Sequence, residues 1–374
     1  MLRVANIIED GRLAGPQLRI LAVAYELYKR GIETTVVFPD VDSEAFASRL
    51  DKSGIRSVAL PLRRLSRGWW KGIRYAIYFP FEIFSLWRFF RKQGFAFIHC
   101  SGGFWQIKGL VAAKLAGIPA IWHMNDTVFP IRWRPLFLLA CQLFVHRLIF
   151  AGRRVHEHYI GTSPCPVDYT EIQAPVNVSV FDPALAKVDA RISSVEGIRV
   201  VTVANVNPLK GIEYFIEMAA TLNSKYANLH FFVIGPIYDS QSAYYQKLTA
   251  LSSQLGLENL TFLGASQDIS SVLKAADVYV CTSISEASPT SVWEAMAMEK
   301  AIVSTDVGDA SRFVIDDMSG LIVPPRDSKA LAAAVSRLID DSELRARYGT
   351  LARRIAAEQL AIDACVDGHI RAYQ

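Results

Sequence analysis

Apolar residues follow two alternating patterns along this chain. Short runs rich in valine, isoleucine and phenylalanine predict buried strands, and longer segments with an apolar residue at every third or fourth position predict amphipathic helices. In the first half the predicted strands are "LRVANII", "ETTVVF", "SVAL", "FAFIHC" and "PAIWHM". Between them we expect helices over residues 16–30, 43–52 and 106–116, with a long aromatic helical region before "FAFIHC".

The second half continues the alternation. Its predicted strands are "RVVTVA", "LHFFVIG", "LTFLG", "VYVCTS", "AIVSTD" and "GLIVP", and its predicted helices are 212–225, 243–255, 269–275, 291–298 and 329–340. Strands that feed helices in this way predict parallel sheets with helices on both faces. We therefore expect an α/β protein of two Rossmann-like domains, residues 1–165 and 197–350, with a linker over 166–196 that is rich in proline, serine and aspartate.

Composition narrows the class of protein. A chain of 374 residues is too long for one ordinary core. The five cysteines are scattered and form no C-x-x-C pair, so we expect reduced thiols and no zinc site. The first residues lack the pattern of a signal peptide, and no apolar run reaches the roughly 18–20 residues that cross a bilayer. These features predict a cytoplasmic protein.

Charge is divided unevenly between the two halves. Residues 1–165 carry a formal net charge of +12 and residues 166–374 one of −8, which together give the net charge of +4. Such asymmetry suggests that each half meets a different partner. Residues 63–92 contain eight lysines or arginines, one acid and ten aromatic residues, a composition typical of a membrane-surface segment. The alternative is a buried aromatic helix with basic flanks, and no nucleic-acid-binding motif accompanies the segment.

Two glutamates follow the predicted strand "VYVCTS". Glu286 lies in a loop of small residues, and Glu294 lies in the first turn of the next predicted helix. Ser291 and Glu294 fit a capping box, which is the structural interpretation of Glu294. The helix start itself favours an anion such as a diphosphate, and carboxylates accept hydrogen bonds from sugar hydroxyls. Two acids beside a phosphate cradle therefore suggest a nucleotide sugar.

A second loop agrees with the first. The segment "VANVNPLKG" follows the first strand of the second half, where Lys210 can reach a phosphate and Gly211 allows close backbone approach. A K-G pair by itself is more often a solvated lysine beside a helix start. Because ligands of open α/β sheets bind beyond the carboxyl ends of the strands, the agreement of two such loops favours the phosphate site.

The second half resembles the retaining GT-B glycosyltransferases of family GT4. The resemblance rests, in chain order, on Asn205, Lys210-Gly211, "FFVIGP", "LTFLG", Glu286 and Glu294 with seven residues between them, "AIVSTDVGD", "GLIVPPRD" and "ALAAAV". It covers most of residues 198–340. The first half is similar more loosely, through the glycines at 11 and 15 and through His123 after "IPAIW".

The resemblance implies a metal-independent, cofactor-free transferase that uses a UDP- or GDP-linked sugar. Lys210 would stabilise the leaving diphosphate, Glu286 and the backbone of Ala287, Ser288, Pro289 and Thr290 would hold the donor sugar, and Glu294 would bind the ribose. His123 would line the transfer site, Gly15 and Asn205 would lie near the donor phosphates, and the side chains after Gly235 and Gly264 would set the preference for the base and sugar. The helix within 351–374 would cross back to the first domain.

Two departures from the family pattern stand out. Many members carry an arginine where this chain has Asn205, and Arg12, Arg19 and Arg312 are the candidates to replace it. The glycines at 11 and 15 are separated rather than paired.

A lone histidine such as His123 is ordinarily structural.

Other motifs point away from rival classes. Asp40 and Asp42 form a D-x-D, but an acid pair after a strand is usually a polar turn, and G-x-G-x-x-G is absent, which disfavours a dehydrogenase. With a basic, aromatic first half, the expected function is transfer to a lipid-linked or oligosaccharide acceptor during bacterial surface polysaccharide assembly, at the cytoplasmic face of the membrane. The alternatives are a nucleotide-sugar epimerase of the same fold and a non-catalytic sugar-nucleotide-binding partner protein.

Overall fold

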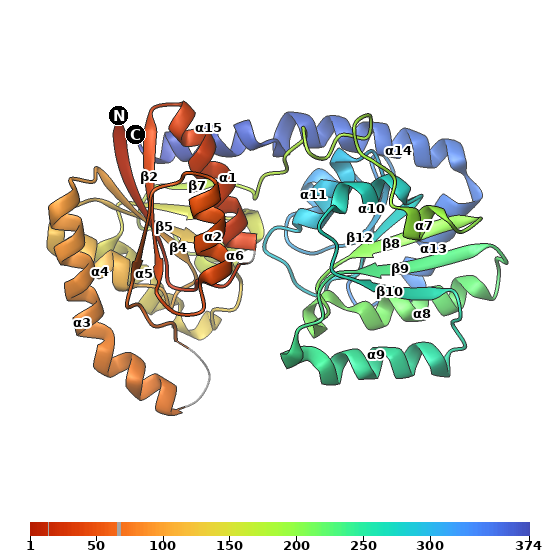
Figure 1. The fold of residues 1–374 in the computed structure, drawn as a ribbon, viewed down its shortest axis with the longest axis horizontal. Coiled ribbons are helices and arrows are strands. Elements are labelled where there is room, and N and C mark those ends of the chain that lie inside the picture. Colours follow the sequence, from red (N-terminus) through yellow and green to blue (C-terminus); the bar gives the residue numbers. More distant parts are fainter. Residues whose placement is uncertain (14, 66–68) are drawn as a thin grey trace. The chain divides into compact units, whose positions relative to one another are not determined.

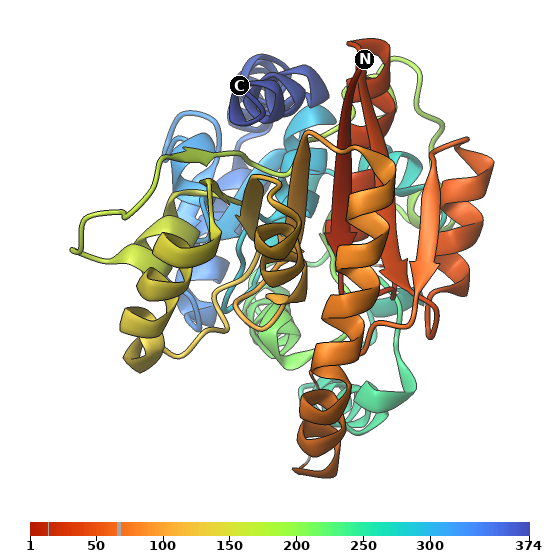
Figure 2. The same cartoon turned by 90° about the vertical axis from the view of Figure 1, so that its left-hand side faces the viewer.

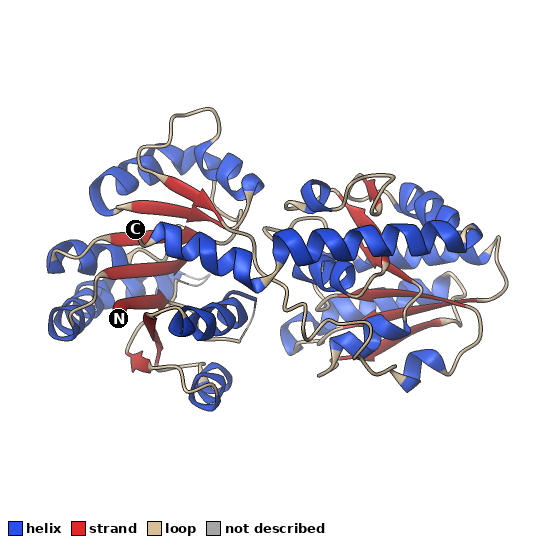
Figure 3. Ribbon diagram, turned by 90° about the horizontal axis from the view of Figure 1, so that it is seen from above, coloured by secondary structure: helices blue, strands red, loops and turns tan. Residues whose placement is uncertain are grey.

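The computed structural model describes residues 1–13, 15–65 and 69–374. The chain divides into two compact units, one formed by Met1–Ala174 with Ile362–Gln374 and the other by Pro175–Ala361. In each unit helices cover both faces of a parallel sheet (Figure 1; Figure 3). The expected α/β class with two Rossmann-like domains is confirmed.

The first unit is built on a seven-stranded sheet of order β3-β2-β1-β4-β5-β6-β7, in which every pair is parallel. The strands are β1 (Leu2–Ile8), β2 (Ile32–Pro39), β3 (Ser57–Leu60), β4 (Phe97–Gly102), β5 (Ala120–Met124), β6 (Arg147–Phe150) and β7 (Tyr169–Glu171). The helices are α1 (Gly15–Lys29), α2 (Glu44–Lys52), α3 (Trp69–Gln93), α4 (Lys108–Ala116), η1 (Ile131–Trp133), α5 (Arg134–Phe144), α6 (Arg153–Ile160) and α15 (Ile362–Ala372).

The second unit has a six-stranded parallel sheet of order β10-β9-β8-β11-β12-β13. Its strands are β8 (Ile198–Val203), β9 (Leu229–Ile234), β10 (Leu260–Gly264), β11 (Val278–Cys281), β12 (Ala301–Thr305) and β13 (Leu321–Val323). Its helices are α7 (Ala190–Ser193), η2 (Pro208–Lys210), α8 (Ile212–Asn223), η3 (Asp239–Gln241), α9 (Ser242–Gln254), α10 (Ile269–Ala275), α11 (Thr290–Ala297), α12 (Ala310–Phe313), α13 (Ser328–Asp340), α14 (Ser342–Ile355) and the π-helical turn η4 (Ala356–Leu360).

The sequence explains both kinds of element. Central strands such as β11 and β12 are buried along their whole length, which requires apolar residues at consecutive positions rather than at alternate ones. Several helices begin at an aspartate whose side chain accepts a hydrogen bond from a backbone N–H of the first turn, as Asp327 does for α13 and Asp341 for α14. Such caps satisfy N–H groups that have no partner within the helix.

Each sheet has one point at which the strand order reverses. In the first sheet, β1 lies between β2 and β4, so the chain moves outward on one side of β1 and then crosses to the other side. In the second sheet, β8 lies in the same way between β9 and β11. Ligands of doubly wound sheets bind beyond the carboxyl ends of the strands at this reversal. The loops after β1 and β4, and those after β8 and β11, are therefore the places to look for sites.

The boundaries of the units differ from the expected ones. β7 pairs with β6, so residues 169–171 belong to the first sheet and not to the linker, while α7 belongs to the second unit. The C-terminal helical stretch is interrupted by η4, and α15 packs on α1 as part of the first unit.

Helix α3 is apolar on two faces. Ile83, Leu86 and Phe90 are buried against the first unit. An outer stripe of five side chains is 40–68% exposed: Trp70, Ile73, Ile77, Phe81 and Phe84. The amino-terminal part of α3 extends beyond the sheet (Figure 1; Figure 2). Within the described ranges, no helix combines the length and apolar character needed to cross a bilayer.

Candidate functional site

An ion pair joins the two loops at the reversal point of the second sheet. Lys210, at the end of η2 after β8, binds the carboxylate of Glu286 in the loop after β11. The hydroxyl of Ser283 donates a second hydrogen bond, of 2.7 Å, to the same carboxylate oxygen of Glu286. The structure thus brings together two predicted site residues that lie 76 positions apart in the chain.

Backbone contacts fix the two loops against each other. The hydroxyl of Thr282 donates to the Lys210 carbonyl over 2.9 Å, and the Ile284 N–H donates to the Leu209 carbonyl over 2.8 Å. Gly211 has a φ of +59°, and a Cβ at this position would overlap the Thr282 carbonyl oxygen. Glycine is therefore required where Lys210 meets the second loop, both for its backbone conformation and for space.

Helix α11 begins beside this pair, in a way that differs from the expected capping box. Its N-cap is Pro289 and carries no side-chain cap. Ser291 lies inside the helix, where its hydroxyl accepts a 2.8 Å hydrogen bond from Tyr279. The carboxylate of Glu294 therefore does not cap α11, and it has no hydrogen-bond partner within the part of the chain that the structure describes. This leaves Glu294 available to a ligand.

Burial governs the acid–base behaviour of Glu294. Loss of solvent around the half-buried carboxyl raises its pKa to about 7. A carboxylate that is shielded from solvent and has no partner is costly to keep ionised, and a hydroxyl donor would compensate that cost.

The segment 287–290 forms the turn into α11. Ser288 receives a 3.1 Å hydrogen bond from the indole of Trp293, which fixes the turn to the buried face of the helix. Gly308, after β12, has a φ of +52°, and a Cβ there would lie 2.8 Å from the carbonyl oxygen of Ala287. The turn is thus held from both sides, with the first N–H groups of α11 at the carboxyl edge of the sheet.

The loop after β8 contains Asn205, whose side-chain oxygen accepts a 2.8 Å hydrogen bond from Asn207. Asn207 in turn accepts from the Leu209 N–H over 2.9 Å and caps η2. Gly235, after β9, has a φ of +154°, and a Cβ would overlap the carbonyl of Ala204. The two asparagines therefore shape the turn that carries Lys210.

The three candidate replacement arginines lie in different places. Arg312 belongs to the second unit, where it pairs with Asp309 at 3.6 Å in the loop region after β12. Arg12 and Arg19 belong to the first unit, Arg12 exposed beside Asp10 and Arg19 buried. Among these three, Arg312 is the one in the same unit as Lys210.

His123 is the central member of a buried cluster in the first unit. Its ring is fully buried, with Nε2 3.0 Å from Nη1 of Arg19 and Nδ1 3.2 Å from Nε2 of His99. Nδ1 of His99 lies 2.7 Å from the Tyr373 hydroxyl. Because both ring nitrogens of His123 have side-chain partners, the ring does not face solvent in this structure, and its expected role in lining the transfer site stays a prediction.

The guanidinium of Arg19 determines the tautomer of His123. A guanidinium is a donor without acceptor atoms, so Nε2 of His123 must be unprotonated and Nδ1 must carry the hydrogen. Burial, followed by the nearby charge of Arg19, holds the pKa of His123 well below its ordinary value. His369 on α15 completes a group of three imidazoles whose nitrogens lie within 4.8 Å of one another. The adjacent buried cation disfavours a metal ion in this group.

The glycines after β1 have unequal roles. A Cβ at Gly11 would overlap the side chain of Ser43, whereas a Cβ at Gly15, the first residue of α1, would meet nothing within 4 Å. Asp40 and Asp42 are exposed in the bend after β2, as expected for a polar turn.

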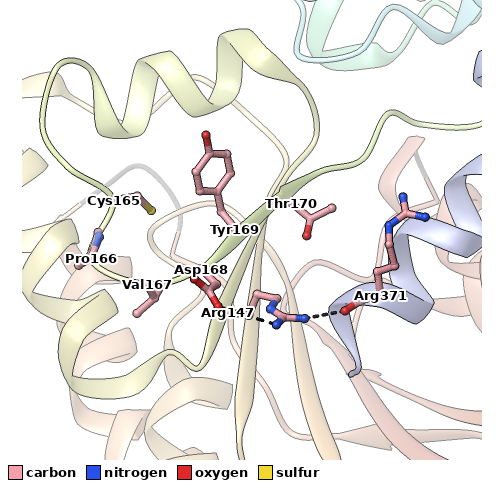
Figure 4. Close-up of a pocket in the computed structure, with 8 residues that line it drawn as sticks. All are labelled: Arg147, Cys165, Pro166, Val167, Asp168, Tyr169, Thr170 and Arg371. Carbon is pink, nitrogen blue, oxygen red and sulfur yellow. Dashed lines mark hydrogen bonds and ion pairs between the residues drawn. The ribbon is translucent and has the colours of Figure 1, made fainter.

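One hollow of the first unit lies away from the carboxyl ends of the strands (Figure 4). It has a volume of about 610 Å³ and is lined by the amino-terminal ends of β6 and β7 and by Arg371 of α15. Arg147 spans it, with Nη1 2.5 Å from the Arg371 carbonyl oxygen and Nη2 3.9 Å from the Asp168 carboxylate. Ligands of parallel sheets bind at the opposite edge, so this hollow is separate from the expected ligand site in the second unit.

Two family models match the chain. The model described as glycosyl transferases group 1 matches residues 190–355, and the model described as glycosyl transferase 4-like domain matches residues 14–157. Together they span most of both units.

Individual relatives agree with these models. The α-D-kanosaminyltransferase of Streptomyces kanamyceticus is 30% identical over 45% of this chain and 43% of its own length. The Escherichia coli UDP-Gal:α-D-GlcNAc-diphosphoundecaprenol α-1,3-galactosyltransferase is 23% identical over 70% of this chain and 71% of its own. Several of the curated relatives are matched over only about half of their length. The crystal structure of Anabaena Alr3699/HepE in complex with UDP and glucose has a TM-score of 0.83 at 18% identity and covers 100% of this chain and 99% of that one.

Proposed function

Because the chain belongs to the GT4-type group 1 glycosyltransferases, whose fold is GT-B, we propose that it transfers a sugar from a UDP- or GDP-linked donor to a lipid-linked glycan. The reaction retains the anomeric configuration and serves the assembly of a bacterial surface polysaccharide. The observation that carries this proposal is the Lys210–Glu286 pair at the reversal point of the second sheet. The names of the Escherichia coli relative, with its diphosphoundecaprenol acceptor, and of the UDP complex of the Anabaena protein support it.

Lys210 supplies the positive charge for the leaving diphosphate. As the bond between the anomeric carbon and the phosphate oxygen breaks, negative charge grows on the diphosphate, and a preorganised ammonium stabilises it. The first N–H groups of α11 add a weaker positive potential at the same edge. The departing phosphate oxygen accepts the acceptor's hydroxyl proton on the same face of the sugar, so no separate protein base is needed.

Besides pairing with Lys210, Glu286 binds hydroxyl groups of the donor sugar. Its carboxylate accepts hydrogen bonds from Lys210 and Ser283, and a carboxylate has acceptor sites left for sugar hydroxyls. Bound in this way, the sugar is held with its anomeric carbon near the ammonium group, and positioning of this kind lowers the barrier. Glu294, with its unpaired carboxylate, accepts from the ribose hydroxyls.

The proposed reaction is independent of metal ions. Divalent cations act on diphosphate leaving groups by neutralising their charge, and here Lys210 and α11 are placed to do so. Full activity in the presence of EDTA is the expected result, and its loss and restoration by Mg²⁺ or Mn²⁺ would contradict this part of the proposal.

The first unit holds the acceptor side and rests on the inner face of the cell membrane. The exposed apolar stripe of α3 is flanked by exposed Arg74, Arg88 and Lys92, so apolar side chains and positive charge occur on one helix. Such a helix lies in the interface of an anionic membrane, where each basic residue contributes about 1 kcal/mol. Residues 66–68 of the segment 63–92 lie outside the described part of the chain.

Donor binding is the first test. Melting temperatures of the wild type are compared with UDP-, GDP-, ADP- and TDP-sugars in the absence of metal, since a ligand that binds the native state raises the melting temperature. We expect one nucleotide family to stabilise the protein and Glu294→Ala to lose that effect. Glu258→Ala is the matched control, because Glu258 is exposed just before β10, at the amino edge of the sheet. Absence of a shift with every donor in folded protein would overturn the proposal.

Measurement of donor turnover with and without acceptor distinguishes a transferase from an epimerase and from a non-catalytic binding protein. Release of nucleoside diphosphate that depends on a lipid-linked acceptor supports transfer. Conversion of the donor sugar without acceptor would instead show an epimerase, and binding without turnover in either assay would show a non-catalytic partner.

A further inference from the structure

Two pockets of the first unit share the loop after β4. We name them by their linings. The polar pocket, of about 420 Å³, includes Asp10, Arg12, Arg64, Gln106 and Asp126. The apolar pocket, of about 310 Å³, includes Tyr75, Phe79, Trp133, Leu139, Ala140 and Leu143. Phe104 and Trp105, in the loop after β4, line both pockets and form the wall between them.

The polar pocket is suited to an anion that also carries hydroxyl groups. Arg12 and Arg64 each lie 2.7 Å from the same oxygen of Asp10, so two guanidinium groups share one carboxylate and leave local positive charge. Arginine binds phosphate through several N–H groups at once. Asp126, which accepts from the Val128 N–H over 3.1 Å, places a carboxylate for sugar hydroxyls in the same pocket.

The apolar pocket is an exposed hydrophobic hollow between α3 and the segment formed by η1 and α5. The Trp105 and Trp133 rings stand edge to face with centroids 5.5 Å apart. Leu139 and Leu143, one helical turn apart on α5, are each 49% exposed. Exposed apolar surface that forms a pocket marks a binding site more often than scattered single residues do.

We infer that these pockets form a two-part site for a polyisoprenoid diphosphate, the lipid portion of the acceptor. The hydrocarbon chain lies in the apolar pocket, and the diphosphate lies against Arg12 and Arg64. The inference rests on the proposed function for the identity of the lipid. Charge complementarity selects this occupant. Arg12 and Arg64 share the single carboxylate of Asp10, so these three groups keep one excess positive charge that an uncharged alcohol would not offset. A free diphosphate would leave the apolar pocket unfilled.

Binding of short, soluble analogues tests the site without measuring catalysis. Farnesyl diphosphate, farnesol and inorganic pyrophosphate are titrated into the full chain by calorimetry. We expect farnesyl diphosphate to bind at least tenfold more tightly than either of the others, because it alone occupies both pockets. Equal affinity for farnesyl diphosphate and pyrophosphate would overturn the apolar half of the site, and equal affinity for farnesyl diphosphate and farnesol would overturn the polar half.

Substitutions in each pocket test which residues bind the hydrocarbon chain and which bind the diphosphate. Ala140→Trp fills the apolar pocket and should remove the preference for farnesyl diphosphate over pyrophosphate. The double variant Leu139→Gln, Leu143→Gln should reduce that preference without loss of folding, since both side chains are half exposed. Arg12→Gln with Arg64→Gln should weaken both diphosphates tenfold or more. Leu115→Trp and Arg56→Gln, exposed positions outside the pockets, are the controls. Unchanged affinities in the pocket variants would overturn the proposal.

Failure of this inference is distinguishable from failure of the proposed function. Farnesyl diphosphate binding tests the first unit, and the melting shift with sugar nucleotides tests the second. A protein that is stabilised by a sugar nucleotide but shows no preference for the isoprenoid diphosphate keeps its proposed function and loses this site.

Discussion

The Arg19 guanidinium lies 3.0 Å from Nε2 of the His123 imidazole, and both residues are almost completely buried. The same guanidinium nitrogen donates to the Asn125 side chain over 2.7 Å. Burial lowers the pKa of Arg19 to about 10, which still leaves it charged at neutral pH. A buried cation therefore orients the histidine at the end of β5.

Replacement of Arg19 by methionine should destabilise the first unit by about 1–3 kcal/mol, because the buried acceptors on His123 and Asn125 lose their donor. Urea denaturation measures this change. Arg56→Met, at an exposed pair with Glu33, should change stability by less than about 1 kcal/mol. In the wild type, nitrogen chemical shifts should show His123 as the Nδ1–H tautomer, and the opposite tautomer would contradict the arrangement.

Lys210→Met should lower the transfer rate constant by about 10²–10³, as removal of one preorganised donor to developing charge does in other enzymes. Donor affinity should change less, because the charge on the diphosphate grows as its bond breaks. Steady-state kinetics with saturating donor measures the effect. Lys247→Met, exposed on α9, is the control. A loss of affinity with an unchanged rate constant would assign Lys210 to ground-state binding only.

Nucleotide affinity should depend on the protonation of Glu294. Its pKa of about 7, raised by burial, means that the carboxyl is largely protonated at pH 6 and ionised at pH 8. Because the ionised form accepts from ribose hydroxyls, the dissociation constant should be about tenfold higher at pH 6 than at pH 8. Calorimetry across this range tests the prediction, and Glu294→Gln should give a flat profile. A flat profile in the wild type would exclude this role.

Lys108 should be essential to the stability of the first unit. Its fully buried ammonium lies 3.0 Å from Glu9 and 2.7 Å from Glu82, and so ties α3 to the end of β1. Lys108→Met would leave buried carboxyls without their cation and should cost about 3–5 kcal/mol. Adding Glu82→Gln should recover part of the loss, as a double-mutant cycle in urea would show. If the two substitutions changed the free energy of unfolding additively, the proposed coupling between Lys108 and Glu82 would be contradicted.

Acid should weaken the packing of α15 in the first unit, because its buried His369 resists protonation. Burial lowers the pKa of His369 to about 4, from 6.5 in an exposed state. The unfolded chain therefore binds the proton first, and up to about 3 kcal/mol of stability is lost as pH falls from 6.5 towards 4. Hydrogen exchange of α15 amides between pH 7 and pH 5 measures the local change. In the His369→Phe variant, hydrogen exchange of the α15 amides should depend less on pH. The same pH dependence in the variant and the wild type would show that another group is responsible.

The sequence was sufficient to predict that the loops carrying Lys210 and Glu286 lie together, because a simple geometric rule connects them. Lys210 and Glu286 each follow a strand of one parallel sheet, and such loops meet at one edge whatever the details of packing. The partner of Glu286 in the same loop, Ser283, was not anticipated, although a hydroxyl three residues before the acid was visible.

Other features depended on packing between distant segments. The surroundings of His123 come from α1 and α15, which no local pattern relates. Strands β6 and β7 are short, four and three residues, and gave little periodic signal. The aromatic residues of α3 occur on several faces, which obscured the division between its buried side and its exposed stripe. A cap by Ser291 was one of the two interpretations of Glu294, and the structure excludes it because Pro289 is the N-cap and the helix begins at Thr290.

The chain enters the second unit after Ala174 and returns to the first at Ile362. In terms of connectivity, the second unit is an insertion within the first, because α15 follows the inserted segment in the chain and belongs to the first unit. A chimera that exchanges the second unit with that of a relative must therefore graft an internal segment, 175–361, and preserve both flanks. A simple cut near residue 175 would separate Arg30 from Asp363 and Asp367, and His99 from Tyr373, within one folding unit.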